Sequence, residues 1–231
     1  MNKPFAAVLF DLDGTLLPMD YDEFTKAYFG LLCKQFPEYD SQALVAAIWK
    51  GTKAMIMNDG AVPNEQRFWD TFGAILGEDI RSRIPEFDNF YRTSFHKAQA
   101  ITRPNPLARQ IIDRARSLAD RVILATNPLF PLCAVEARLS WIGLKPEDFD
   151  WITTYENSAY CKPNPAYYTD ILARFSLDPA QCLMVGNDVK EDAAAATQAG
   201  LSVHLITDDL LTHDLDPSAY SCSSWAAWLE G

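Results

Sequence analysis

The hydrophobic pattern of the chain predicts strands and helices that alternate, interrupted once by a long helical stretch. Residues 5–10 form a continuous apolar run, which is typical of a strand buried on both faces of a parallel sheet. Further short apolar runs predict strands at 121–126, 151–154, 182–185 and 202–206. Helical patterns separate these runs, and such an alternation predicts βαβ units in a doubly wound α/β domain.

Between residues 18 and 100 the period changes to that of amphipathic helices. Phe24, Tyr28 and Leu32 fall on one helix face, and similar stripes begin at Ser41 and at Asn64, a predicted N-cap. We therefore expect a Rossmann-like core domain formed by residues 1–17 and 101–231, with an inserted α-helical cap domain over 18–100. The final SCSSWAAWLEG segment is expected to form a surface helix.

Composition narrows the class of protein. The formal net charge is −11, which would repel a nucleic acid, so no nucleic-acid partner is expected. Five scattered cysteines without a C-x-x-C pair predict neither a disulfide framework nor a zinc site, and they suit a reducing compartment. The chain has no apolar run long enough to span a membrane and no signal-peptide pattern, so we expect a cytoplasmic protein without a membrane partner.

Polar side chains follow four of the predicted strands. In open parallel sheets, ligands bind beyond the carboxyl ends of the strands, so these residues are candidates for a site. In chain order they are Asp11, Asp13, Thr126, Asn127, Lys162, Asp188 and Asp192. Two carboxylates as close as Asp11 and Asp13 repel each other and are costly to desolvate. The pair therefore indicates either a solvated turn or a place where a cation and an anionic substrate bind.

The combined set of groups suits phosphoryl transfer through an aspartyl-phosphate. A carboxylate and a phosphate repel each other, and a shared divalent cation offsets that repulsion. Magnesium prefers oxygen ligands, with one or two carboxylates and a phosphate oxygen among them. A second carboxylic acid two residues after the nucleophile could protonate the leaving oxygen and then deprotonate the attacking water.

Four stretches carry a resemblance to a known family. FDLDGT, LATN, the Lys-Pro of CKPNP and VGNDVKED resemble, in order, the four motifs of the haloacid dehalogenase (HAD) superfamily. The chain is most similar to the phosphatases of that superfamily that have a helical cap inserted after the first motif. The resemblance implies a magnesium-dependent phosphatase that acts on a small phosphorylated metabolite.

The resemblance also implies roles for the residues at the first three strand ends. Asp11 would be the nucleophile and a magnesium ligand, and Asp13 the general acid and base, its backbone carbonyl also meeting the metal. Thr126 and the Asn127 backbone would hold the phosphoryl group. Lys162 would neutralise the nucleophile and the phosphate.

For the fourth strand end the resemblance implies metal binding. Asp188 would complete the magnesium site, and Asp192 would be a ligand or a support; because they are four residues apart, they share one face of a helix start. We favour Asp188 as the direct ligand because it lies nearer the strand end. The helix dipole alone could explain one of the two. The three histidines, His96, His204 and His213, are interpreted as structural.

Other functions remain compatible with parts of this pattern. A phosphomutase of the same family would keep every catalytic residue and return the phosphoryl group to a sugar. A haloacid dehalogenase would leave Asp13 and Asp188 without a role. A non-catalytic phosphate-binding module would be expected to lack Asp11, Asp13 or Lys162, and all three are present. The substrate and the oligomeric state do not follow from the sequence.

Overall fold

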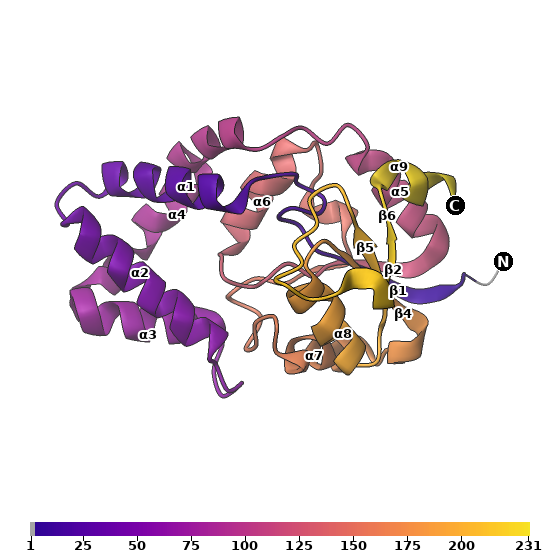
Figure 1. The fold of residues 1–231 in the computed structure, drawn as a ribbon. Helices are drawn as coiled ribbons and strands as arrows, with labels where there is room; N and C mark the ends of the chain where they lie inside the picture. Colours follow the sequence, from indigo (N-terminus) through magenta and orange to yellow (C-terminus); the bar gives the residue numbers. More distant parts are fainter. Residues whose placement is uncertain (1–2) are drawn as a thin grey trace.

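A parallel six-stranded sheet forms the centre of the core in the computed structural model, which describes residues 3–231 (Figure 1). The strand order is β3-β2-β1-β4-β5-β6. The strands span Phe5–Phe10 (β1), Ala119–Leu124 (β2), Trp151–Ile152 (β3), Cys182–Gly186 (β4), Ser202–Ile206 (β5) and Ser221–Ser223 (β6). All five pairings are parallel. The predicted α/β fold class is confirmed.

Helices cover both faces of this sheet. Because side chains alternate along a strand, Val8 and Phe10 pack on one face of β1, and Ala7 and Leu9 pack on the other. The first face is covered by α5 (Ala108–Leu118), α6 (Leu132–Trp141) and α9 (Trp225–Glu230), and the second by α7 (Pro165–Phe175) and α8 (Ala195–Gln198). The strand β1 is thus buried on both sides, as its apolar sequence requires.

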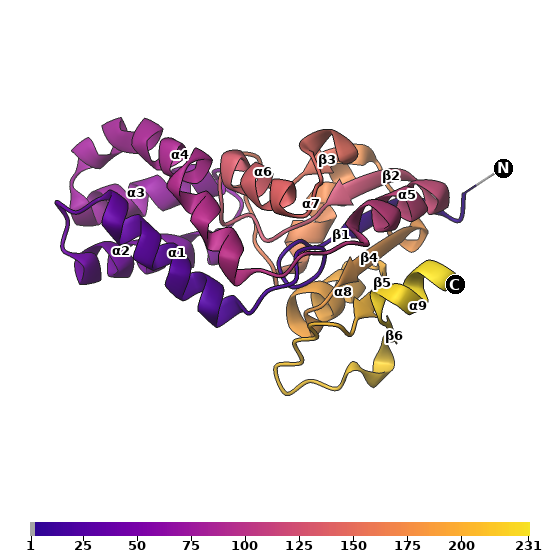
Figure 2. The same cartoon turned by 90° about the horizontal axis from the view of Figure 1, so that it is seen from above.

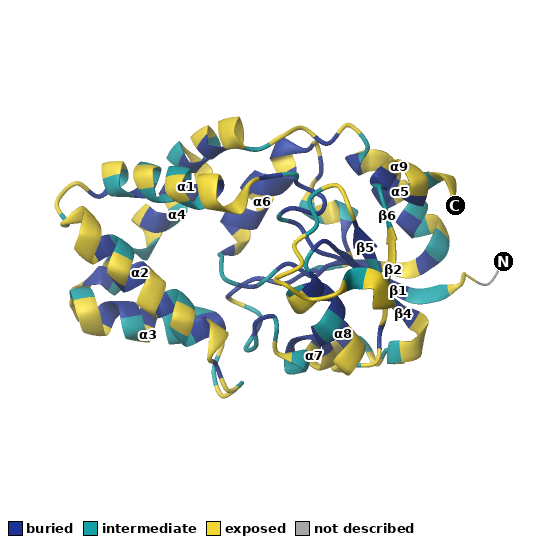
Figure 3. Ribbon diagram, in the orientation of Figure 1, coloured by how far each residue is buried: buried dark blue, intermediate teal, exposed yellow. Residues whose placement is uncertain are grey.

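The inserted cap lies beyond the carboxyl ends of the strands, to one side of the core (Figures 1 and 2). It contains α1 (Tyr21–Gln35), α2 (Ser41–Ile56), α3 (Asn64–Leu76) and α4 (Ile84–Arg92), with 3₁₀ turns at Glu78–Arg83 and Ser94–Ile101. The two chain crossings lie side by side, because Met19 and Thr102 form an antiparallel bridge. The outer cap surfaces are mostly exposed, and the inward helix faces are buried (Figure 3). The exact domain boundaries at 18 and 100 stay a prediction.

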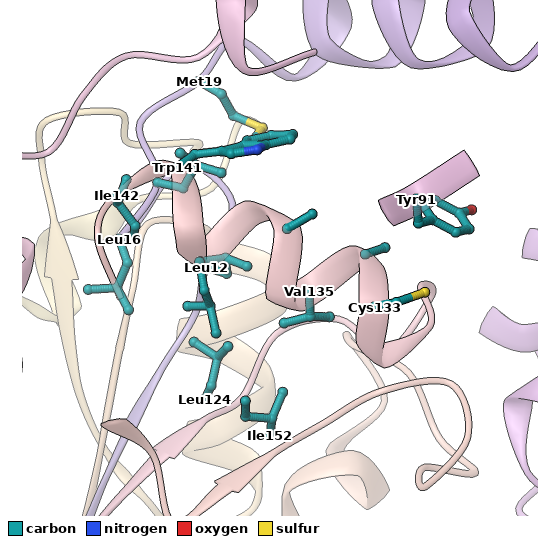
Figure 4. Close-up of a cluster of buried hydrophobic side chains, with 14 of the residues drawn as sticks. Leu12, Leu16, Met19, Tyr91, Leu124, Cys133, Val135, Trp141, Ile142 and Ile152 are labelled. Atoms are coloured by element: carbon teal, nitrogen blue, oxygen red, sulfur yellow. The ribbon is translucent and has the colours of Figure 1, made fainter. Parts of the chain in front are cut away.

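Helix α6 lies between the sheet and the cap (Figure 4). Val135 points towards Leu124 and Ile152 of the sheet, whereas Cys133 lies beside Tyr91 of the cap. One continuous apolar cluster therefore joins cap and core. This packing positions the cap over the sheet edge.

Several predicted elements differ from the observed ones. The strand predicted at 121–126 is Ala119–Leu124, so Thr126 lies in the loop beyond it. Asn64 is the first residue of α3 and not its N-cap, because its side chain bonds to the core instead. The helix after β4 begins as a π-helix at Val189–Ala194 and continues as the short α8.

The carboxyl-terminal segment is also not the predicted surface helix. Its first three residues form β6, and the helix α9 that follows buries Trp225 and Trp228 against Phe10. The two tryptophan side chains have a large apolar area, and burying it against Phe10 is more favourable than leaving it in water, as a surface helix would. Across residues 3–231, no helix is long and apolar enough to cross a membrane.

Candidate active site

Asp11 lies at the carboxyl end of β1 and is held by two side chains. Lys162 Nζ donates a hydrogen bond to Asp11 Oδ1 at 2.8 Å, and the Thr15 hydroxyl donates to Oδ2 at 3.2 Å. Asp11 is 8% exposed. Burial raises the pKa of Asp11 to about 8, with the positive charge of Lys162 opposing that rise. The carboxylate is thus fixed in position and short of positive charge.

Lys162 bridges Asp11 to a second buried carboxylate. Its Nζ lies 2.6 Å from Asp192 Oδ1, and both side chains are 1% exposed. The other oxygen of Asp192 accepts hydrogen bonds of 3.0 Å from the backbone N–H groups of Asn187 and Asp188. Asp192 therefore positions Lys162 and shapes the turn after β4.

Gly186 permits this arrangement. A Cβ at that residue would lie 2.1 Å from Asp192 Oδ2, closer than any real contact. The Gly-Asn-Asp sequence after β4 therefore allows the backbone to approach the buried carboxylate.

Asp13 forms an ion pair that the sequence analysis did not anticipate. Its partner is Arg138 of α6, which is fully buried. Arg138 Nε donates a hydrogen bond to Ala134 O at 3.2 Å, and the guanidinium lies 4.5 Å from the centre of the Phe130 ring. Within residues 3–231, Asp13 Oδ1 is buried and accepts no hydrogen bond. One oxygen of Asp13 is thus anchored, and the other is left for a ligand.

Thr126 and Asn127 follow β2, beside Asp11. The Ala125 N–H donates to Phe10 O at 2.7 Å, which aligns this loop with the end of β1. Asn127 Nδ2 donates to Glu191 Oε2 at 3.0 Å. Burial raises the pKa of Glu191 to about 7, against the attraction of Lys162. Glu191 was given no role from the sequence, although it lies within the fourth motif.

Asp188 follows β4 and is engaged on both oxygens. Oδ1 accepts from the backbone N–H groups of Lys190 and Glu191 at 2.8 Å, which caps the following π-helix. Oδ2 lies 2.6 Å from Nε2 of His213, whose side chain is 46% exposed. His213 was interpreted as structural, yet it contacts a predicted metal ligand. Its place in a loop 25 residues later gave no signal of this.

A cavity between cap and core opens onto Asp13. It has a volume of about 80 Å³, and Trp69 and Tyr91 of the cap and Phe130 and Tyr155 of the core are among its lining residues. We call it the cap–core cavity. Aromatic side chains of the cap therefore form part of the wall of a site.

Comparison with known proteins decides the family. The sequence model of the haloacid dehalogenase-like hydrolases matches residues 5–200. The chain belongs to the haloacid dehalogenase-like hydrolases. This HAD hydrolase is 26% identical over 219 residues to YhcW of Bacillus subtilis (strain 168), which is named as a phosphatase, covering 91% of this chain and 89% of that one.

One further relative and one solved structure are similar to this HAD hydrolase. It is 25% identical to a phosphoglycolate phosphatase of Nitrosospira multiformis, over 88% of this chain and 83% of the relative. The solved structure of the HAD hydrolase YfnB of Bacillus subtilis, bound to magnesium, has a TM-score of 0.60 at 18% identity and covers 98% of this chain and 97% of its own. The recognised family, its phosphatase type and the enzyme class are confirmed, and the YfnB likeness shows the fold.

The donor chemistry of the site suits magnesium, which the family resemblance implies. The carboxylates of Asp11 and Asp188 and the backbone carbonyl of Asp13, which the resemblance implies as ligands, are oxygen donors of the kind that magnesium prefers. As they are placed, no three His, Cys, Asp or Glu side chains of that range converge as a metal site. Asp188 is turned to His213, and Asp192 is fully bonded. The metal ligands stay predictions.

Proposed function

We propose that this HAD hydrolase is a magnesium-dependent phosphatase that hydrolyses a small phosphorylated metabolite through an aspartyl-phosphate on Asp11. One observation supports this most: Asp11 is held by Lys162 and Thr15 at the end of β1, while Asp13 lies two residues later in the wall of a cavity. A nucleophile and an acid are thus adjacent, and only the acid lines the space where the rest of a substrate would fit.

In the first step, a carboxylate oxygen of Asp11 attacks phosphorus and the bond to the ester oxygen breaks. Lys162 favours the anionic form of Asp11 against the effect of burial on its pKa, and it stabilises charge on the phosphoryl oxygens. Asp192 keeps Lys162 in place. Magnesium, when bound by Asp11, Asp13 and Asp188, would offset the repulsion between carboxylate and phosphate.

Proton transfer belongs to Asp13. It gives a proton to the leaving ester oxygen, and it then takes one from the water that hydrolyses the aspartyl-phosphate, which releases inorganic phosphate and restores Asp11. Arg138 holds one oxygen of Asp13, so the acid has a fixed position through both steps. Thr126 and Asn127, adjacent to Asp11, would bind the transferring phosphoryl group.

The cap supplies closure in this proposal. We assign residues 18–100 to a cap domain that excludes bulk water while the core performs the chemistry. Relatives named as phosphoglycolate phosphatases make phosphoglycolate the first metabolite to test. We expect no nucleic-acid or membrane partner and a cytoplasmic location.

The proposal is tested by measuring phosphate release from p-nitrophenyl phosphate with magnesium or with EDTA. We expect hydrolysis only with magnesium, and we expect Asp11→Asn to lower kcat by at least about a thousandfold. Asp170→Asn, which changes an exposed aspartate of α7, is the matched control. Release of phosphate by Asp11→Asn at the wild-type rate would remove Asp11 from its role. A phosphoryl group that reappears on a sugar, and not as free phosphate, would indicate a mutase.

A further inference from the structure

The cap–core cavity has no positive charge on its wall. Of its lining residues, all within residues 3–231, none is a lysine, arginine or histidine, and the charged ones are Asp13 and Asp88. The remaining wall is mostly aromatic, with Trp69, Tyr91 and Phe130 among the rings. A second anionic group on a substrate would therefore lose its hydration without gaining a cation.

The nearest buried cation does not change this. Arg138 lies behind the ring of Phe130 and is not part of the cavity wall. Its charge is already paired with Asp13. A carboxylate that entered the cavity would therefore meet the aromatic face of Phe130 and the negative charge of Asp13.

Asp88 adds to the negative character of the cavity. Its Oδ2 lies 4.0 Å from Arg92 of the same helix, and its Oδ1 accepts from the Cys133 thiol at 3.8 Å. The side chain of Arg92 is 61% exposed, so this contact matches the charge of Asp88 only in part. Asp88 would therefore repel an anionic group in the cavity, and the aromatic rings would contact an apolar one.

We infer that the substrate of this site is a phosphomonoester whose organic part is compact, apolar and free of a second negative charge. The inference rests on the proposed function, in which Asp13 protonates the leaving oxygen, and on placing the organic part in the cap–core cavity and not in the open groove that Asp13 lines together with Arg103. This substrate would distinguish the HAD hydrolase from its relatives named as phosphoglycolate phosphatases, because the organic part of phosphoglycolate carries a carboxylate. The cavity volume of about 80 Å³ favours a group of a few carbon atoms.

One pair of near-isosteric esters tests the charge requirement. Isobutyl phosphate carries an isopropyl group where phosphoglycolate carries a carboxylate. We expect kcat/KM for isobutyl phosphate to exceed that for phosphoglycolate by at least about tenfold. Equal or better use of phosphoglycolate would overturn the inference.

A designed charge gives a second test. Thr52 of α2 lines the cavity and is half-buried, so Thr52→Lys would place an ammonium in the aromatic wall. We expect this variant to shift the preference towards phosphoglycolate by at least about tenfold. Gln66→Lys adds the same charge on an exposed part of α3 outside the cavity, and it should leave the preference unchanged. An unchanged preference in folded Thr52→Lys would count against the inference.

The two proposals fail in different ways. If wild type hydrolyses neither p-nitrophenyl phosphate nor either of the two esters in magnesium, the proposed function is wrong and the inference falls with it. If wild type hydrolyses p-nitrophenyl phosphate but prefers phosphoglycolate among the esters, the phosphatase stands and only the inference is wrong.

Discussion

Lys162 connects the candidate nucleophile to the buried carboxylate of Asp192, so replacing it should destabilise the whole site. The ammonium is 1% exposed and contacts both carboxylates, at 2.8 and 2.6 Å. Removing one partner of a buried ion pair costs about 3–5 kcal/mol. Because Lys162→Met leaves two carboxyl groups without their cation, we expect the unfolding free energy to fall by about 5 kcal/mol. For a chain of this size that corresponds to a fall in Tm of roughly 10–20 °C.

The assay is thermal unfolding at pH 7 in EDTA, so that no metal contributes. Lys190→Met, which removes an exposed lysine next to the site, is the control and should melt near the wild-type temperature. Adding Asp192→Asn to Lys162→Met removes one of the stranded charges and should recover part of the loss. If Lys162→Met melts within about 2 °C of wild type, the ammonium does not stabilise the site and the reasoning is refuted.

Two further predictions concern Arg138 and Asp11. Arg138→Met should lower kcat by about a hundredfold with KM little changed, because it misplaces Asp13 and not the phosphate. Arg138→Lys should restore part of the lost kcat. An unchanged kcat of Arg138→Met in steady-state assays would contradict the positioning role. The pKa of Asp11 is about 8 in the folded chain, whereas its ordinary value is 3.8. Between these two pH values the folded chain keeps a proton on Asp11 that the unfolded chain has lost. In EDTA, the unfolding free energy of wild type should therefore fall relative to that of Asp11→Asn as pH rises from about 4 to 8. Urea titrations in which the two unfolding free energies differ by the same amount at every pH would contradict this prediction.

Apolar periodicity was sufficient to predict the central strands. The predicted strands at 5–10 and 202–206 coincide with β1 and β5, because buried strands of a parallel sheet must be apolar along their length. The strand β6 was missed because its Ser-Cys-Ser sequence has no apolar run, and only its pairing with β5 defines it. The burial of α9 depends in the same way on a distant partner, Phe10.

The candidate site could be predicted as a list of groups but not as a set of contacts. Strand ends identified Asp11 and Lys162, which the fold brings together across 151 residues. The sequence did contain a signal for Arg138, since a charged residue on the apolar face of LCAVEARLSW is costly without a partner. Its partner, Asp13, lies 125 residues earlier, and only the packing of α6 between sheet and cap reveals it.

Charge balance links the proposed chemistry to the inferred substrate. The carboxylates of Asp11, Asp13 and Asp192 share two cations, Lys162 and Arg138, so this part of the site carries more negative than positive charge. The pKa of Asp11, raised to about 8, is a consequence of burial with too little positive charge nearby. A phosphate dianion would add to this excess, and a divalent cation would offset it. The cap–core cavity contributes no cation of its own. With a divalent cation bound, the positive charge at the sheet edge would balance one anionic group, the phosphate, and would leave none for a second one, so a substrate with a second anionic group should be rejected.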